Sequence, residues 1–235
     1  RFAEESGAEE GQKTGIADPF AKPAALGAAK FRPRPYVQAE LSLESLFGQD
    51  IFDPGRALLL KAKLAGAIEQ EAPIAKTLLV KRVLSACGIK RAGSRMAKAV
   101  GDLAEELDFP KTKDKDTGET FFWSHAEPPE SYFAYRTVPA GEHRRDAREI
   151  PRQEAANAVC AALFGCGAVP DIQLAREAAY LMGFLRLGVA LEEAMLRGVS
   201  EARARGCVAT GDGARYRLAD QQAQPPEGNG MQKAF

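Results

Sequence analysis

The sequence has few of the residues that metal sites and acid–base catalysis require. Only two histidines, His125 and His143, occur in 235 residues, and the four cysteines form no Cys-x-x-Cys pair. The histidines do not flank the cysteines at metal-ligand spacing. We therefore expect buried free thiols rather than a metal centre. Two histidines in polar stretches also offer few candidates for general acid–base catalysis.

Long apolar runs and an excess of one charge are missing as well. No run approaches the roughly twenty apolar residues that cross a bilayer, and no basic-then-apolar segment of a secretory signal opens the chain. The sequence therefore predicts a cytoplasmic protein without a membrane partner. Lys plus Arg and Asp plus Glu each number 32, so any surface that attracts nucleic acid must be local.

Motifs of common catalytic sites are also absent. The chain has no Gly-x-x-x-x-Gly-Lys-Ser/Thr phosphate loop and no Gly-x-Ser-x-Gly nucleophile elbow. A nuclease centre of the Asp, then Asp/Glu-x-Lys type needs a lysine near its metal-binding acids, but the only lysine after Asp171 is Lys233. We therefore predict that this chain is not itself an enzyme and needs no cofactor.

The two ends of the chain differ in composition from its middle. Residues 1–50 carry four prolines among Ala, Gly and Lys without a helical or strand period, which predicts a mostly irregular linker. Its apolar side chains from Tyr36 to Phe47 are expected to dock onto a neighbouring surface. Residues 221–235 are polar and predict a frayed tail. Because the chain begins at Arg1 rather than Met, we expect it to be a fragment.

Between these flanks, one pattern occurs twice at a constant offset of 95 residues. Residues 79–93 align with residues 174–188, and both segments contain Gly-apolar-x-Arg-x-Gly. The same offset, without a gap, pairs Leu64 with Val159, Ile74 with Val169, Met96 with Leu191, Ala99 with Ala194, Phe121 with Tyr216 and Trp123 with Leu218. So many matches in register predict a duplication.

Hydrophobic periodicity predicts three helices and a hairpin in each copy. In the first copy, the helices are expected at about 56–71, 76–87 and 94–107, with extended Pro73-Ile74 and a return strand at 120–123. In the second, they are expected at 152–164, 171–182 and 189–205, with a strand at Val169 and a hairpin through 207–218 whose tip is Gly211-Asp-Gly213. The fold class is thus mainly α with small β-hairpins (α+β), as tandem duplicated winged-helix-like modules.

These predictions divide the chain into five segments. A linker (1–50) precedes module 1 (51–125), a connector (126–150) leads to module 2 (151–220), and a tail (221–235) follows.

Module 1 combines a basic helix-turn-helix with a basic hairpin. Helix-turn-helix proteins place the second motif helix in the major groove, while neighbouring side chains contact phosphates. The window 73–115 holds ten basic and five acidic residues, whereas the matching window 168–210 holds five of each. The predicted DNA contacts are Lys90, Ser94, Arg95, Lys98, Lys111, Lys113 and Lys115. We expect module 1 alone to contact DNA, because the acidic pair Glu192-Glu193 replaces Lys98 and its neighbour in module 2.

The repeated glycines and arginines of the two turns suggest a structural role. The turn residues concerned are Gly88, Arg91, Gly93, Gly183, Arg186 and Gly188. Gly88 is typical of a left-handed helix cap, and Ser94 is expected to cap the third helix. Because Arg91 and Arg186 recur although module 2 has no basic face, we expect both to bind carbonyl groups at the end of the second helix.

Aromatic residues cluster at the end of module 1 and in the connector. The run Phe121–Trp123 could stack on unpaired bases. At strand spacing, however, Phe121 and Trp123 share a face, and we expect them to close the core over the third helix. The three aromatic residues between 132 and 135 are expected to pack between the modules.

Several residues of module 1 resemble a bacterial, helicase-associated domain of unknown function. They are Glu71-Ala-Pro-Ile74, Leu79 with Arg82, Gly88-Ile-x-Arg91-x-Gly93 and the Phe-Phe-Trp strand. The likeness covers about residues 55–125 and continues more loosely through Tyr135-Arg136 and Arg148-Glu-Ile150. It implies the C-terminal part of very large proteins with an upstream superfamily-one helicase motor and a nuclease related to very-short-patch-repair endonucleases, which act in DNA processing or defence.

Two functions remain open at this point. The first is a non-catalytic C-terminal region of a helicase/nuclease-type protein that contacts DNA through module 1, with the upstream domains as partners in the same polypeptide. The alternative is a docking module for other domains or for a partner subunit, without direct DNA binding. Neutral net charge and the acidic third helix of module 2 favour this alternative.

Overall fold

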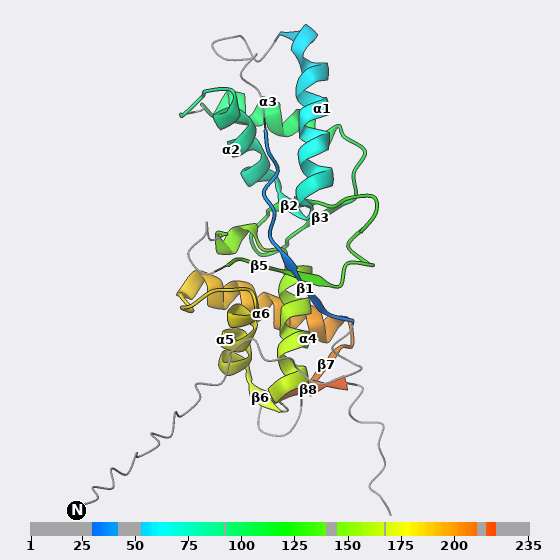
Figure 1. The fold of residues 1–235 in the computed structure, drawn as a ribbon, viewed down its shortest axis with the longest axis vertical. Helices are drawn as coiled ribbons and strands as arrows, with labels where there is room; N and C mark the ends of the chain where they lie inside the picture. The colour runs from blue at the N-terminus through cyan, green and yellow to red at the C-terminus, as the bar shows by residue number, and fades with distance from the viewer. Residues whose placement is uncertain are drawn as a thin grey trace, which may run out of the picture.

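The structure, a computed structural model, describes residues 30–41, 53–91, 93–139, 145–166, 168–210 and 215–219. These residues form six α-helices and eight short strands in a mixed α/β fold (Figure 1). Module 1 fills the upper half of the view and module 2 the lower half, with β5 (Ala134–Thr137) of the connector between them. Among the described residues, no helix has both the length and the apolar character needed to cross a membrane.

Module 1 consists of three helices and a three-stranded sheet. Its elements are α1 (Pro54–Glu71), β2 (Ile74–Ala75), α2 (Lys76–Ala86), α3 (Ser94–Glu105), β3 (Lys111–Lys113) and β4 (Thr120–Phe122). Asp53 caps α1 by accepting a hydrogen bond from the Gly55 N–H, and Pro54 occupies the first turn, where its missing N–H costs nothing. The antiparallel sheet has the order β2-β4-β3.

One apolar face of each helix forms the core of module 1. Leu60, Leu64 and Ile68 recur every four residues along α1 and are fully buried. They pack in one cluster with Leu79 of α2 and Val100 of α3. Burying each of these side chains contributes about 1.5–3 kcal/mol, so the helices predicted from periodicity form for the expected reason.

Module 2 has the same order of elements and the same strand order. Its elements are α4 (Arg152–Cys166), β6 (Val169–Pro170), α5 (Asp171–Leu181), α6 (Val189–Ala204), β7 (Val208–Thr210) and β8 (Arg215–Leu218), and its sheet has the order β6-β8-β7. The strands β2 and β6, the helices α2 and α5, and the first residues of α3 and α6 are each separated by 95 residues. The offset found in the sequence therefore holds for these elements.

The 95-residue offset no longer relates the two modules beyond the third helix. α6 has 16 residues and α3 has 12. Tyr216 pairs with Val169 as Phe122 pairs with Ile74, so the strand register matches Phe122 to Tyr216 rather than Phe121. The predicted hairpin tip, Gly211-Asp-Gly213, lies outside the described residues.

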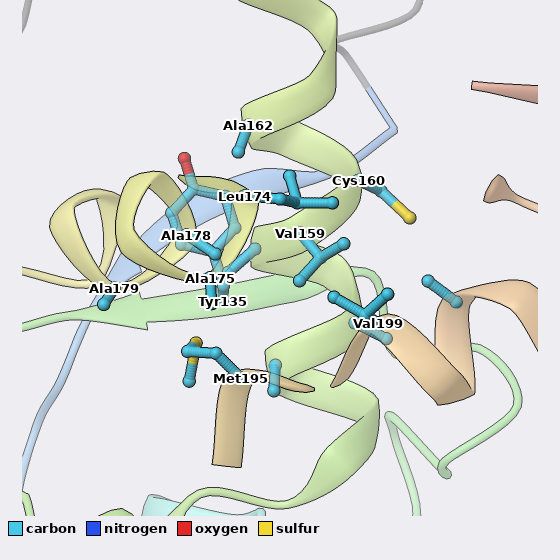
Figure 2. Packing of buried hydrophobic residues seen from close by; sticks show 14 of the residues in the cluster. Tyr135, Val159, Cys160, Ala162, Leu174, Ala175, Ala178, Ala179, Met195 and Val199 are labelled. Carbon is cyan, nitrogen blue, oxygen red and sulfur yellow. The ribbon is translucent and has the colours of Figure 1, made fainter. Parts of the chain in front are cut away.

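Small side chains dominate the core of module 2. Figure 2 shows Tyr135 of β5 (Ala134–Thr137) beside Ala175 and Ala178 of α5, and all three belong to one buried cluster. At Gly198, α6 lies so close to α4 that an added Cβ would be 2.6 Å from the Cβ of Ala155. The absence of a side chain at Gly198 is what permits this close helix packing.

Residues 30–41, here called the strap, lie in the segment for which an irregular linker was predicted. They instead contain β1 (Arg32–Pro35), which pairs in parallel with β5. β1 pairs on one side only, and such an edge strand tolerates Pro33 and Pro35 although they lack an N–H. The docking expected from Tyr36 onward holds for the strap: Ala39 is buried and Leu41 packs on the module 1 cluster. Residues 42–47 lie outside the described part.

The aromatic run at the end of module 1 is divided between two faces of the sheet. Phe122 lies in the core with the helices, whereas Phe121 and Trp123 pack on the opposite face with Tyr132 of the connector. The Trp123 and Tyr132 rings meet edge to face, with centroids 5.2 Å apart. The prediction that Phe121 and Trp123 close the core over the third helix was wrong, because the connector covers the second face of the sheet and makes both faces apolar.

Candidate nucleic-acid interface

The α2–α3 turn of module 1 is closed by backbone hydrogen bonds. The Ile89 N–H donates to the Leu84 carbonyl and the Gly88 N–H to the Ser85 carbonyl, both at 2.9 Å, with Gly88 at φ +79°. This is the Schellman arrangement, in which a left-handed residue follows the helix. Module 2 repeats it at Gly183, which has φ +91°. Both glycines therefore occupy the left-handed position expected of Gly88.

The arginines of these turns do not contact the carbonyl groups at the end of the second helix, contrary to the prediction. Arg91 and Arg186 are exposed, and neither forms a hydrogen bond or ion pair within the described part of the chain. The backbone N–H groups already satisfy the helix-end carbonyls, so the predicted guanidinium contact is not present. Gly93 and Gly188, rather than Ser94, are the N-cap residues, and both have ordinary extended dihedrals. Ser94 is the first residue of α3.

The predicted DNA contacts of the turn and helix lie together on the surface. Lys90, Ser94, Arg95 and Lys98 are all exposed between the turn and the middle of α3. Acidic residues are confined to the second half of that helix, beginning at Asp102, which pairs with Lys98 at 2.6 Å. Because both partners are exposed, the pair contributes only about 0.5 kcal/mol, and Lys98 can exchange it for a phosphate at small cost.

The three hairpin lysines have different surroundings. The Lys111 ammonium donates to the Glu105 carbonyl at 2.6 Å and lies 5.7 Å from the centre of the Phe122 ring. It therefore caps the end of α3. Lys113 and Lys115 are exposed, and their ammonium groups form no hydrogen bond or ion pair within the described residues.

Asp114 fixes the hairpin tip and ties it to module 2. One of its carboxylate oxygens accepts hydrogen bonds from the N–H groups of Asp116 and Thr117, at 2.9 and 3.1 Å. The same carboxylate pairs with Arg152 of α4 at 3.1 Å and with Arg197 of α6 at 3.7 Å. Burial alone would raise the pKa of Asp114, but Arg152 and the two N–H groups hold it below its ordinary value. The hairpin is thus held in place by the second module.

A buried ion network joins the connector to module 2. The Glu154 carboxylate accepts hydrogen bonds from the guanidinium groups of Arg136 and Arg145, at 2.6 to 3.1 Å, and from the Arg136 N–H at 2.8 Å. All three side chains are at most 5% exposed. Burial opposes ionisation of Glu154, yet the two arginines outweigh it and lower its pKa to about 2.

The network continues into module 1 through Arg136. Its guanidinium also donates to the Glu71 carbonyl, at 2.8 Å, at the end of α1. The Glu71 carboxylate accepts a hydrogen bond from the Tyr36 hydroxyl at 2.5 Å and forms an ion pair with Arg82 of α2. Tyr36, whose pKa is raised to about 12 by burial and by Glu71, lies with its ring beneath the guanidinium of Arg145, 5.1 Å away. One continuous set of polar contacts therefore links the strap, both modules and the connector, which we call the polar hub.

The polar hub does not follow from the sequence patterns, although Glu71, Arg82 and Arg136 lie in the segments that resemble the helicase-associated domain. The available signal was a charged residue inside an apolar stretch. Arg136 follows four aromatic or small residues, and Glu154 opens the alanine-rich helix α4. Charged residues in such places are rarely buried without a partner.

The α5–α6 helix-turn-helix of module 2 has exposed apolar residues at four positions where module 1 has polar ones. The exposed residues Ile172, Tyr180, Leu185 and Val189 stand 95 residues after Thr77, Ser85, Lys90 and Ser94. On α6, Glu193 takes the place of Lys98. The same backbone arrangement thus presents a basic surface in module 1 and an apolar surface with charges of both signs in module 2.

A cavity of about 430 Å³ lies where the strap, the module 1 hairpin and α4 meet. Glu201 and Arg205 in its lining pair with each other at 2.8 Å, and Asn157 donates to two connector carbonyls. The Asn157 Oδ1 has no partner within the described residues. No group of three or more His, Cys, Asp and Glu residues is placed to hold a metal ion in the described part of the chain.

Comparison with known protein families gives a match for the first part of module 1. A family described as a protein of unknown function (DUF3320) matches residues 49–98, about a fifth of the chain. The match spans α1, β2, α2 and the beginning of α3, and so includes Glu71, Arg82 and the α2–α3 turn. It is shorter than the resemblance expected from the sequence over residues 55–125. No curated protein and no solved structure matches the chain.

Proposed function

We propose that the chain is a non-catalytic pair of winged-helix modules that contacts DNA through module 1. The observation that carries this proposal is the exposed basic set formed by Lys90 in the α2–α3 turn and by Arg95 and Lys98 in the first half of α3. In helix-turn-helix proteins, this end of the second motif helix reaches the base edges of the major groove.

The order of the elements supports the winged-helix assignment. In each module a helix and a short strand precede the helix-turn-helix, and a hairpin returns to the short strand to give a three-stranded antiparallel sheet. Lys113 and Lys115 of the module 1 hairpin, which corresponds to the wing, then face solvent as additional phosphate contacts.

Module 2 has an architectural role in this proposal. Through Arg152 and Arg197 it holds Asp114, and hence the wing of module 1, in one position. The polar hub fixes the two modules to each other through Glu71 and Glu154. A wing that is already fixed loses less conformational entropy on binding.

We further propose that the chain acts beside a helicase motor and a nuclease of the same polypeptide, in DNA processing or defence. The support is the resemblance of residues 55–125 together with the match over residues 49–98. In this setting the chain would hold duplex or forked DNA while other domains carry out the chemistry.

DNA affinity measured by fluorescence anisotropy tests the proposal. A labelled duplex and a labelled fork are titrated at two salt concentrations with the wild type, with Arg95→Glu/Lys98→Glu and with Arg203→Glu/Arg215→Glu. The last pair reverses the same number of charges at exposed positions of module 2. We expect binding that weakens with salt, and a salt slope that falls by about two for the module 1 variant alone. Equal binding by all three proteins would contradict DNA contact by module 1.

A second candidate function is docking without DNA contact. The exposed apolar residues of the module 2 turn, Leu185 and Val189 above all, favour it. The same titration separates the two functions, because a docking module binds neither DNA probe at either salt concentration.

A further inference from the structure

The helix-turn-helix of module 2 exposes four large apolar side chains: two on α5, one in the α5–α6 turn and one at the beginning of α6. Ile172, Tyr180 and Leu185 are 51–54% exposed, and Val189 is 78% exposed. Single exposed apolar residues are common, but a group on one helix-turn-helix marks an interaction surface. We call these four residues and the charged residues beside them the α5–α6 face.

Module 1 shows that the fold does not require this apolar character. At the same four positions it carries Thr77, Ser85, Lys90 and Ser94 in the same turn geometry. The backbone therefore forms equally well with polar residues there. Something other than folding must account for the apolar residues of module 2.

The charges of the α5–α6 face have both signs and no partner of their own. Arg176 lies between Ile172 and Tyr180 at four-residue spacing, so the three side chains share one side of α5 over about 12 Å. Arg186 follows Leu185 in the turn, and Glu193 is exposed on α6. None of these three charged groups forms an ion pair or hydrogen bond with any part of the chain that the structure describes.

This mixture of charges fits some partners better than others. Nucleic acid or an anionic membrane would meet Glu193 at the beginning of α6, and an acidic peptide would satisfy the arginines but not that carboxylate. A second copy of the same face offers both signs. In a twofold contact, a pair formed by residue i of one copy and residue j of the other is repeated as j with i, so the arginine side of each copy can meet the glutamate side of the other.

We propose that the chain associates with a second copy through the α5–α6 face of module 2, with the apolar residues buried at the centre and Arg186 opposite Glu193 of the other copy. This contact does not depend on DNA binding. The α2–α3 turn belongs to the opposite half of the molecule (Figure 1), so a dimer of this kind leaves both module 1 surfaces open.

Sedimentation equilibrium of the 235-residue chain over a range of concentrations tests the proposal. We expect a reversible monomer–dimer equilibrium. Leu185→Lys and Val189→Ser introduce the residues that module 1 carries at these positions, and each should raise the dissociation constant about tenfold. The matched control is Leu58→Ser, because Leu58 is an apolar residue of α1 that is 78% exposed and lies outside the face.

A charge exchange tests the orientation of the two copies. Arg186→Glu should weaken the dimer about tenfold, and adding Glu193→Arg should restore it. Circular dichroism shows whether each variant is folded, and Ile172→Thr with Tyr180→Ser replaces any variant that is not. A chain that stays monomeric at every concentration would overturn the proposal, as would a dimer weakened equally by Leu58→Ser or unaffected by Arg186→Glu.

Discussion

Modules 1 and 2 share an order of helices and strands but differ at almost every exposed position of the turn. Lys90 corresponds to Leu185 and Lys98 to Glu193, while the backbone hydrogen bonds of the two turns are the same. The buried residues and the turn glycines therefore determine the shape of each module. The exposed residues determine what each module can contact, and these have diverged.

The cores of the two modules also differ, in the size of the side chains at corresponding helix positions. Module 1 has Leu60 and Leu103 at the positions where module 2 has Ala155 and Gly198. In module 2 the helices α4 and α6 approach until there is no room for a side chain at Gly198, whereas in module 1 larger side chains fill the space between α1 and α3. The same arrangement of helices thus tolerates two packing solutions, provided that the volumes on facing helices compensate.

The largest predicted effect concerns the polar hub, which both modules share. Glu154→Gln removes a buried carboxylate from between Arg136 and Arg145, so both guanidinium groups lose their counter-charge. We expect the free energy of unfolding to fall by about 3–5 kcal/mol, measured by urea denaturation. Glu193→Gln changes an exposed carboxylate of the same module and should leave stability within about 0.5 kcal/mol. A similar loss in both variants would show that the hub adds little.

The same carboxylate predicts how stability depends on pH. Because the pKa of Glu154 is depressed to about 2 in the folded chain, its contribution is fully present above the unfolded value of about 4.3 and is lost as the pH falls toward 2. Wild-type stability should therefore decline over this interval, and the decline should be smaller in Glu154→Gln. Equal slopes for the two proteins would contradict the assignment.

A smaller effect is expected in the α5–α6 turn of module 2. Gly183 has φ +91°, and an added Cβ would lie 2.2 Å from the Val138 carbonyl oxygen of the connector. Gly183→Ala therefore combines an unfavourable backbone conformation with a steric clash and should cost about 2–4 kcal/mol. Gly118→Ala, at φ +72° with open space around it, should cost about 1–2 kcal/mol. Thermal unfolding of the two variants measures the difference in their loss of stability. This difference disappears if the Val138 carbonyl of the connector does not contact the turn.

The third prediction tests whether module 1 depends on module 2 for the position of its hairpin. Arg152→Ala leaves the buried Asp114 carboxylate with the N–H groups of Asp116 and Thr117 and, among the described residues, with Arg197 as its single cationic partner at 3.7 Å. We expect a loss of about 1–2 kcal/mol and faster amide hydrogen exchange at residues 111–122. Arg148→Ala, a change of the same kind at an exposed position of the connector, serves as the control. Unchanged exchange in Arg152→Ala would mean that the hairpin holds its position without module 2.

The sequence was sufficient to predict the helices of both modules because their apolar residues recur at the helical period, as Leu60, Leu64 and Ile68 do. It was insufficient for the hub, since Arg136 meets Glu71 across 65 residues and Glu154 across 18. No local pattern encodes such a pairing. The strap was missed for a related reason: a proline-containing edge strand has no period of its own and forms only because β5 is there to pair with it.

In the candidate interface, too, features set by local spacing were predicted and features set by tertiary contacts were not. Lys90, Arg95 and Lys98 were predicted as an exposed group and are exposed. Helical spacing fixes which side of α3 faces outward for Arg95 and Lys98, whereas Lys90 lies in the turn before α3. Lys111 could not be assigned from sequence, because its role depends on where α3 ends and on the Glu105 carbonyl that it reaches. The sequence alone does not distinguish a lysine that faces solvent from a lysine that caps a helix.

The smallest predicted effect comes from giving module 2 the charges of module 1. Ala190→Arg with Glu193→Lys introduces the residues that module 1 has as Arg95 and Lys98. In a chain that also carries Arg95→Glu/Lys98→Glu, we expect DNA affinity measured by anisotropy at low salt to recover by a few-fold, about 1 kcal/mol. Recovery should be incomplete, because Leu185 still replaces Lys90. If affinity does not change, exposed charge alone does not distinguish the modules, and the fixed hairpin of module 1 becomes the decisive difference.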